Sequence, residues 1–333
     1  MPNARIAGIG RYVPPLVVSN DDLTQRMDTS DEWIQQRTGI QRRHYSEGNV
    51  GAADMGAIAA DEALQRAGVG RDEVDCVIFA TLSPDFDMPS SACVLQDRLG
   101  IGGRPAFDVR NQCSGFIYSL ATANAFIKAG RFARVLVVGG EVHSTGIDIT
   151  TRGRDVAVIF GDGAAAVLVE ATDAPDKGIL TTHLHAEGKF AEKLWLEYAS
   201  SRQRPRLSEE MIASDSPRVF PRMEGRYVFK HAVQRFTEVI NEALDAAGYT
   251  IADLDLLIPH QANLRISQMV ALGFELPEAK LFNNIQRYGN TTAASIGLAL
   301  YEAIEEERVR DGSLICLAAF GAGFTWASAL IRW

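Results

Sequence analysis

The amino-acid sequence predicts an α/β fold built from two similar halves. Strand-like apolar runs alternate with helical patterns along most of the chain, which is typical of mostly parallel, buried sheets covered by helices. The chain also contains an internal repeat. Residues 61–80 align without gaps on residues 241–260, at a constant offset of 180, with seven of twenty positions identical. We therefore expect a first half over residues 1–172 and a second half over residues 173–333.

The composition narrows the class of protein. The chain has 333 residues, of which 47% are hydrophobic and 23% charged, as in an ordinary globular protein. Its formal net charge of -9 argues against nucleic acid as a partner, because phosphate binding needs a basic surface. No apolar stretch approaches the ~20 residues that span a bilayer, and the N-terminus does not resemble a secretory signal. We expect a cytoplasmic protein without a membrane segment.

An early helix carries the first candidate binding residues. It is expected within Asp28–Arg43, where Ser30 or Asp31 can serve as the N-cap, and Trp33 and Arg37 stand one turn apart on it. Two interpretations of that pair remain open: a surface cation–π contact, or a clamp that holds a flat, phosphorylated ligand. The elements expected around this helix are a strand over Arg5–Ile9, a helix over Gly51–Ala67, a strand over Asp75–Ala80, a loop over Ser83–Pro89 and a helix over Ser90–Leu99.

Cys113 lies where the strand-like run Ala106–Val109 turns into an apolar helix. The unpaired N–H groups of a first helical turn favour negative charge, so we expect a lowered thiol pKa and a nucleophilic thiolate. The alternative is a small buried hydrophobe, which is what most free cysteines are. For Cys76, Cys93 and Cys316 we favour that core role. Four cysteines without CxxC spacing predict neither a disulfide framework nor a metal site.

The repeat extends beyond its aligned core. The helix after Cys113 and the buried strand Val135–Gly139 have counterparts in a helix over Thr292–Glu307 and a strand over Leu314–Ala318. Between the halves, residues 194–221 are irregular and charged, and we expect them to form a surface excursion rather than a third domain.

Polar residues of the second half stand at the ends of its buried elements. His260 follows Pro259 at the end of an apolar strand, where it would face the crevice in which α/β sheets bind ligands. Asn290 precedes a helix, so it is either a helix cap or a polar group of the site. The turn Gly321-Ala322-Gly323 can direct a backbone N–H at a developing oxyanion.

Together these motifs resemble the β-ketoacyl-[acyl-carrier-protein] synthase III family of the thiolase-like superfamily. They are QCSGF around Cys113, PHQAN around His260, GNTTAAS around Asn290 and the GAGFTWAS turn, in this order over the whole length. The FGDGA strand and the Trp33 segment agree with the same family. The resemblance implies a thiolase-like five-layer αβαβα sandwich, a homodimer and no cofactor, with CoA and phosphopantetheine thioesters as substrates.

The resemblance also implies a reaction. An acyl-CoA primer would be condensed with a malonyl thioester, on acyl carrier protein or on CoA, with loss of CO2 and through an acyl-cysteine. Cys113 would be the nucleophile, and His260 and Asn290 would donate hydrogen bonds to the malonyl thioester oxygen. The backbone N–H groups of Cys113 and Gly323 would form the oxyanion hole.

Binding residues follow by the same resemblance. Side chains expected to contact CoA, pantetheine or the carrier protein are Trp33, Arg37, Arg154, Lys230, Asn263 and Arg265. A basic rim of this kind can steer an acidic carrier protein. Met88 stands where relatives often place an aromatic residue that reaches into the partner subunit's acyl pocket. Because methionine is slimmer and adaptable, we expect a primer of roughly six to twelve carbons.

Two other functions remain open at this point. One is a thiolase-fold acyltransferase, or a non-decarboxylating condensing enzyme, that uses the same acyl-cysteine. The other is a non-catalytic acyl-binding member, whose signature would be a missing cysteine, histidine or asparagine. All three residues are present.

Overall fold

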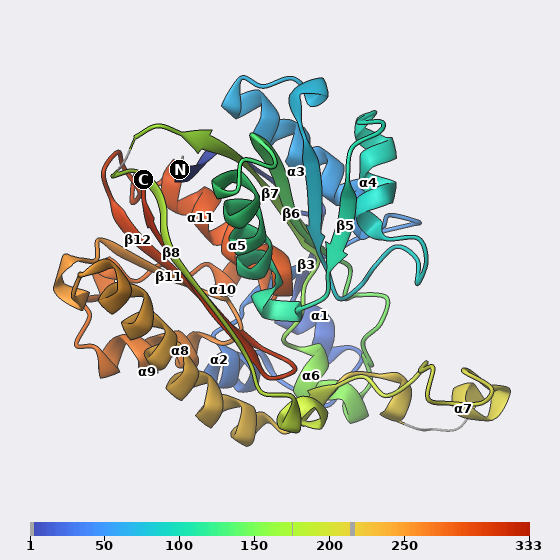
Figure 1. Cartoon of the computed structure of the whole chain (residues 1–333). Helices are drawn as coiled ribbons and strands as arrows, with labels where there is room; N and C mark the ends of the chain where they lie inside the picture. Colours follow the sequence, from blue (N-terminus) through green and yellow to red (C-terminus); the bar gives the residue numbers. More distant parts are fainter. Residues whose placement is uncertain (1–2, 175, 214–216) are drawn as a thin grey trace.

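The computed structural model describes residues 3–174, 176–213 and 217–333. Two large β-sheets face each other, with helices between them and on both outer sides (Figure 1). The two middle helices share one apolar core with the inner faces of both sheets. A second core lies between the first sheet and its outer helices, and a third between the second sheet and its outer helices. The five-layer αβαβα sandwich expected from the sequence is confirmed.

The first sheet has the strand order β1-β7-β6-β4-β5. The strand bounds are Asn3–Tyr12 for β1, Gly163–Thr172 for β7, Arg134–Glu141 for β6, Cys76–Ala80 for β4 and Ala106–Val109 for β5. β4 pairs in parallel with β5 and β6, whereas β7 pairs antiparallel with β6 and β1. Every residue of β4 is buried, because helices cover both faces of the sheet at this point.

The second sheet has the strand order β11-β12-β13-β8. The bounds are Leu256–Pro259 for β11, Leu314–Gly321 for β12, Thr325–Arg332 for β13 and Gly178–Ala186 for β8. Only the β11–β12 pair is parallel here, so the expectation of mostly parallel sheets is wrong. Residues 322–324 alone join β12 to β13, and a link of that length can form a hairpin but not a parallel crossover.

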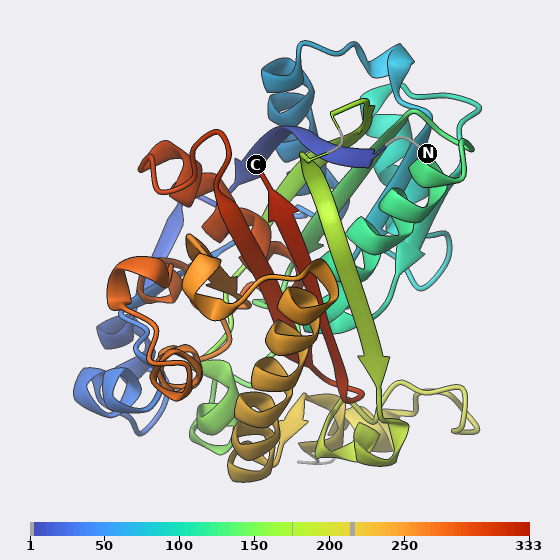
Figure 2. The ribbon, with the colours of Figure 1, turned by 60° about the vertical axis from the view of Figure 1, so that its left-hand side comes forward.

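The layers of helices are seen from two sides in Figures 1 and 2. They are α5 (Gly115–Lys128) and α11 (Ser295–Glu305) in the middle, α3 (Ala52–Ala67) and α4 (Ser91–Leu99) outside the first sheet, and α8 (Gly225–Ala247) and α9 (Leu264–Gly273) outside the second. Figure 2 shows the long α8 lying across the outer face of the second sheet. No helix in the described ranges has both the length and the apolar character needed to cross a membrane.

The duplication is visible in small details. α3 and α8 both end at a glycine in the left-handed conformation, Gly68 with φ 67° and Gly248 with φ 73°. Asp75 accepts a hydrogen bond from the backbone N–H of Arg134, and Asp255 accepts one from that of Leu314. Each aspartate thus ties the start of one strand to the start of its neighbour in the same way. The boundary expected between residues 172 and 173 stays a prediction.

The remaining elements lie at the sheet ends and in the excursion. They are β2 (Leu16–Ser19) paired with β3 (Arg42–Tyr45), and the helices α1 (Asn20–Thr24), α2 (Asp31–Thr38), α6 (Arg154–Ala157) and α10 (Ile285–Tyr288). β9 (Leu194–Trp195) and β10 (Arg222–Met223) pair antiparallel and close the base of the excursion. The segment around α7 (Glu209–Ala213) projects from the body in Figure 1, as a surface excursion should.

Candidate active site

Cys113 sits in a short 3-10 turn, Gln112–Ser114, that leads directly into α5. Its side chain is nearly buried, with 7% exposure. Gly321, at the end of β12, faces it so closely that an added Cβ would lie 2.9 Å from the Sγ atom. Only glycine at position 321 therefore leaves room for the sulfur. Of the other thiols, Cys76 and Cys316 are buried as expected, but Cys93, on α4, is exposed, so the expected core role of Cys93 is wrong.

The predicted lowering of the Cys113 pKa is wrong. Burial, followed by the charge of Glu141, raises the pKa of the thiol to about 12. The backbone N–H groups of Ala322 and of Cys113 itself act in the opposite direction by hydrogen bonding to the sulfur. The helix start therefore supplies one favourable N–H group, that of Cys113, and the β12–β13 turn supplies the other, but the loss of hydration outweighs both.

The same hydrogen bonds bear on the predicted oxyanion hole. The backbone N–H that the structure directs at the sulfur from the β12–β13 turn belongs to Ala322. Gly323, the predicted donor, has a φ of 129°, a conformation that suits glycine. Its part in the oxyanion hole stays a prediction, and Ala322 is the stronger candidate.

His260 follows β11 and is 3% exposed. Its Nδ1 atom lies 2.6 Å from the hydroxyl oxygen of Ser295, the first residue of α11. Its Nε2 atom is buried and has no hydrogen-bond partner within the described part of the chain. Burial, with a smaller effect from His143, lowers the pKa of His260 to about 3, so the imidazole is neutral.

Asn290 lies before the 3-10 turn Thr292–Ala294 and is 5% exposed. Its side-chain oxygen accepts the backbone N–H of Thr292 at 2.8 Å. This bond fixes the amide orientation, which leaves the amide nitrogen as the group that can donate to a ligand. Both roles considered for Asn290 are thus compatible: the oxygen closes a turn, and the nitrogen remains available.

One pocket brings the three predicted catalytic residues together. Its lining includes Cys113, His260 and Asn290, with Phe320 and Gly321 beside the sulfur. The rest of the lining is mainly apolar and comes from α8, α9 and the β9–β10 region: Leu194, Met223, Val228, Phe229, Ala232, Phe236 and Ile266. A thiol, an imidazole and a side-chain amide therefore share a mainly apolar pocket.

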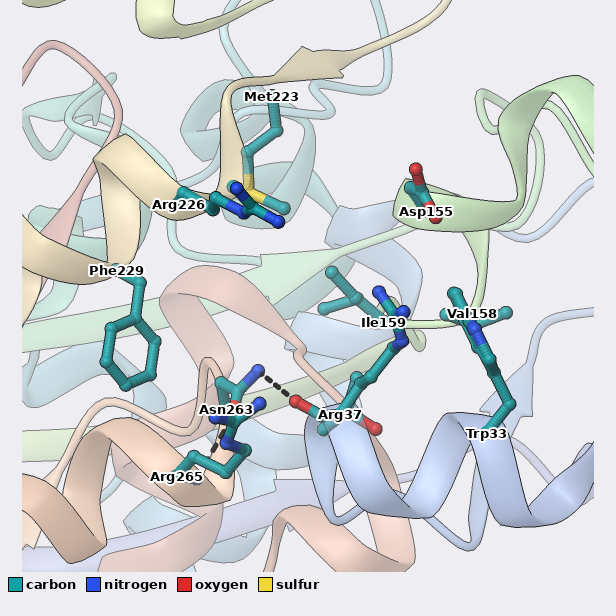
Figure 3. A pocket seen from close by; sticks show the side chains of 12 residues that line it. Trp33, Arg37, Asp155, Val158, Ile159, Met223, Arg226, Phe229, Asn263 and Arg265 are labelled. Atoms are coloured by element: carbon teal, nitrogen blue, oxygen red, sulfur yellow. Dashed lines mark hydrogen bonds between the residues drawn. The ribbon is translucent and has the colours of Figure 1, made fainter.

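A larger cavity of about 550 Å³ lies next to this pocket and shares Ile159, Met223, Gly225, Phe229 and Asn263 with it. Figure 3 shows this outer cavity, with Trp33 and Arg37 from α2 on one side and Arg265 on the other. The side-chain nitrogen of Asn263 donates to the carbonyl of Arg37 at 2.8 Å, which ties α9 to the end of α2.

Of the remaining predicted binding residues, Arg154 lies close to Trp33 of this cavity, whereas Lys230 and Met88 line neither cavity. The guanidinium of Arg154 lies 4.9 Å from the Trp33 ring centre and that of Arg37 lies 4.3 Å from it, so the three residues form one cluster. Lys230 is exposed on α8 and lines neither cavity. Met88 is 86% exposed and is absent from the lining of the Cys113 pocket. Their predicted roles therefore depend on a carrier protein and on a partner subunit, respectively.

Several functional candidates escaped the sequence analysis. Arg226 lines the outer cavity one helical turn before Lys230, so the spacing of basic residues on α8 could have identified it. Ser295 is the last residue of the GNTTAAS motif, but the motif alone gave it no role, and Glu141 carried no local signal, because only the fold brings these two residues to the site. Among the described residues no group of three or more His, Cys, Asp or Glu could hold a metal ion.

The fold and the site define a class of protein: a thiolase-fold enzyme whose pocket holds a cysteine beside a histidine and an asparagine. Two family models for 3-oxoacyl-[acyl-carrier-protein] synthase III match the chain, one over residues 107–188 and its C-terminal counterpart over residues 244–333. The β-ketoacyl-[acyl-carrier-protein] synthase III of Methylococcus capsulatus is 43% identical over 99% of both chains. The enzyme of that name from Rhodospirillum centenum is 43% identical over 98% of both.

Comparison with solved structures points to the same family. The 3-oxoacyl-[acyl-carrier-protein] synthase III of Aquifex aeolicus matches with a TM-score of 0.90 and 42% identity, over 99% of this chain and 100% of its own. The enzyme of that name from Pseudomonas aeruginosa has a TM-score of 0.90 and 38% identity, over 99% and 98%. The chain belongs to the β-ketoacyl-[acyl-carrier-protein] synthase III family. It is an acyltransferase-type condensing enzyme of fatty acid biosynthesis.

Proposed function

We propose that the enzyme condenses an acyl-CoA primer with a malonyl thioester in two half-reactions at the Cys113 pocket. In the first, the Cys113 sulfur attacks the thioester carbonyl, the acyl group moves to the sulfur and CoA leaves as its thiol. The proton lost by Cys113 is thereby balanced by the proton gained by CoA. The backbone N–H groups of Cys113 and Ala322, which point at the sulfur, are placed to stabilise the oxyanion of the tetrahedral intermediate.

In the second half-reaction, the malonyl thioester loses CO2 and the electron pair passes to its thioester oxygen. His260 through Nε2 and Asn290 through its amide nitrogen would donate hydrogen bonds to that oxygen. The resulting carbanion attacks the acyl-cysteine carbonyl, a β-ketoacyl thioester leaves, and Cys113 regains a proton. The observation that carries this proposal is the single apolar pocket that contains Cys113, His260 and Asn290.

The outer cavity supports thioesters of CoA or phosphopantetheine as substrates, without a further cofactor. Aromatic and basic side chains at the mouth, Trp33, Arg37 and Arg265, suit a nucleotide and its phosphates. Arg226 and Lys230 extend positive charge along α8 towards solvent, and such a rim suits an acidic acyl carrier protein as malonyl donor. A comparison of malonyl-carrier protein with malonyl-CoA in kcat/KM tests this choice, and equal values would count against the carrier protein.

We also propose that the enzyme acts as a cytoplasmic homodimer. β5 forms an edge of the first sheet, and Phe86 and Met88, on the loop before α4, are 57% and 86% exposed. An open sheet edge beside exposed apolar side chains suits pairing with a second copy. Four free thiols suit a reducing compartment. Light scattering on the purified enzyme tests the dimer, and a monomeric mass at micromolar concentration would refute it.

A product assay tests the reaction itself. The enzyme is incubated with acyl-CoA and malonyl-carrier protein, and CO2 and β-ketoacyl product are measured together. Formation of both supports the decarboxylative condensation. Acyl transfer to the carrier protein without release of CO2 would instead favour the alternative of an acyltransferase that uses the same acyl-cysteine.

A further inference from the structure

Ser295 is the one side chain of the described residues that hydrogen-bonds to the imidazole of His260, with its hydroxyl oxygen 2.6 Å from Nδ1. It is the first residue of α11 and is 1% exposed. The neutral imidazole has two tautomers, and the hydrogen bond made by one ring nitrogen decides which nitrogen carries the proton. The role of Ser295 therefore depends on which way its hydroxyl proton points.

The groups around the Ser295 hydroxyl indicate the direction in which its proton points. The backbone N–H of Gln261 points at the Ser295 oxygen from 3.4 Å, so the oxygen already faces one donor. The acceptor that the structure offers to the hydroxyl proton is Nδ1 of His260. If Nδ1 carried a proton, Ser295 would be left as a buried donor without an acceptor, which costs free energy. With the serine donating, the ring proton is on Nε2.

We propose that Ser295 is a positioning residue that holds His260 in the Nε2–H tautomer and so turns a hydrogen-bond donor towards the substrate. The buried Nε2 atom, which has no partner within the described part of the chain, lies at the pocket lined by Cys113 and Asn290. In the opposite tautomer Nε2 would present a lone pair to the negative oxygen and repel it. The effect of Ser295 on the rate of catalysis rests on the proposed function. The tautomer of His260, in contrast, can be measured without turnover.

The duplicated half shows that the fold does not need this hydroxyl. At the offset of 180, the counterpart of Ser295 is Gly115, the first residue of α5, and that of His260 is Ala80. These two counterparts are also neighbours, since a Cβ added to Gly115 would lie 3.2 Å from the Cβ of Ala80. The same helix start therefore packs on the same strand end with no polar group, which argues that the serine–histidine contact serves the site.

The experiment uses the full-length enzyme labelled with 15N-histidine. Ser295→Ala removes the donor, and Ser295→Cys supplies a weaker one in a similar volume. Nitrogen NMR reports the His260 tautomer, with His260→Gln to assign the signal, and the two half-reactions are measured separately. Ser119→Ala is the matched control, because Ser119 is a fully buried serine on α5 whose hydroxyl has no partner in the described ranges.

We expect Ser295→Ala to lose the Nε2–H signature and to slow malonyl decarboxylation by about 10- to 100-fold, the range known for metal-ligating histidines that lose the partner of their other ring nitrogen. Acylation of Cys113 should change less than about twofold, Ser295→Cys should be intermediate, and Ser119→Ala should match wild type in both readouts. A wild-type tautomer and wild-type decarboxylation in both Ser295 variants would overturn the proposal, whatever happens to Tm. If the wild-type enzyme shows the tautomer but decarboxylates no malonyl thioester, the proposed function fails and the tautomer assignment stands.

Discussion

The two halves of the chain share a backbone plan but contribute different side chains to the Cys113 pocket. At the offset of 180, β6 (Arg134–Glu141) corresponds residue for residue to β12 (Leu314–Gly321), and the turn before α5 corresponds to the turn before α11. Even an unusual conformation is shared, since Gln112 and Thr292 both have positive φ, 41° and 46°. Duplication therefore supplied two copies of one sheet end, where side chains of both halves meet.

What differs is the side chain at each matched position. The matched pairs are Cys113 and Ala293, Ala80 and His260, Gly115 and Ser295, and Glu141 and Gly321. In each pair one member is alanine or glycine and the other has a polar or ionisable side chain. The comparison teaches that a small member can itself belong to the pocket, since only glycine at position 321 leaves room for the Cys113 sulfur.

The most severe test of this comparison replaces the proposed nucleophile, Cys113, with the residue type that the second half has at the matched position. Cys113→Ala places alanine at both matched positions and should abolish acyl-enzyme formation, because no other cysteine lines the pocket. Intact-protein mass spectrometry after incubation with acyl-CoA measures it. Cys93→Ala, which removes the exposed thiol on α4, is the control and should acylate normally. Undiminished acylation of Cys113→Ala would show that the first half does not supply the nucleophile.

The second prediction concerns the donors of the second half. His260→Ala and Asn290→Ala should each slow malonyl decarboxylation by on the order of 100- to 1000-fold, because each removes one hydrogen bond to the developing enolate. Acyl transfer to Cys113 should be affected much less. Stopped assays of each half-reaction separate the two effects. Decarboxylation at the wild-type rate in both variants would mean that the division of labour between halves is wrong.

Much of this comparison was accessible from the sequence. The repeat at the offset of 180 predicted the duplication, and Cys113, His260 and Asn290 were singled out because each stands where a buried element ends. The five layers followed from the family resemblance. Periodicity could not give the strand directions, since an apolar run reads the same in either direction and only the short β12–β13 link makes that pair antiparallel.

The electrostatics were the part that the sequence could not give. The helix start predicted a stabilised thiolate, but burial and the charge of Glu141 together raise the pKa of Cys113. Glu141 is distant in sequence from the cysteine, and no local pattern marks it. Ser295 and Ala322 lie in segments that the sequence singled out, but their individual contacts with His260 and with the Cys113 sulfur exist only in the folded chain.

The third prediction concerns the segments that follow the matched strands β4 and β11, which differ in where they place their side chains. After β11 the chain lines the mouth of its own cavity through Asn263 and Arg265, whereas after β4 it presents Met88 to solvent. If Met88 reaches a partner's acyl pocket, Met88→Phe should lower kcat/KM for octanoyl-CoA relative to acetyl-CoA by about 5- to 150-fold, since overpacking costs about 1 to 3 kcal/mol.

The control for that prediction is the covalent step with acetyl-CoA, which Met88→Phe should leave unchanged. A chain-length profile identical to wild type would remove Met88 from the acyl pocket. So would a wild-type preference for acetyl-CoA over octanoyl-CoA, because the expected roomier pocket would then be absent. Either outcome leaves the roles of the matched catalytic positions untouched.

The prediction with the smallest expected effect concerns the last matched pair, Glu141 and Gly321. Glu141 is fully buried, and its carboxylate accepts hydrogen bonds from Thr81, Leu82 and Ser83. Burial raises the pKa of Glu141 to about 7, so the group gains its charge as pH rises through that value. The charge opposes ionisation of Cys113. The neutral variant Glu141→Gln should therefore lower the pKa of the Cys113 thiol and increase its alkylation by iodoacetamide a few-fold.

The pH dependence of the alkylation rate distinguishes an effect of the Glu141 charge from an effect of disturbing the loop at residues 81–83. Below about pH 6, Glu141 is protonated and neutral in the wild type, so the two alkylation rates should converge. Above about pH 8 the wild-type group is charged and the rates should differ most. The measurement is made in a Cys93→Ser background, since that exposed thiol would also react. A ratio that stays constant across this range would mean that Glu141→Gln acts by loosening residues 81–83, and that the carboxylate charge does not restrain the nucleophile.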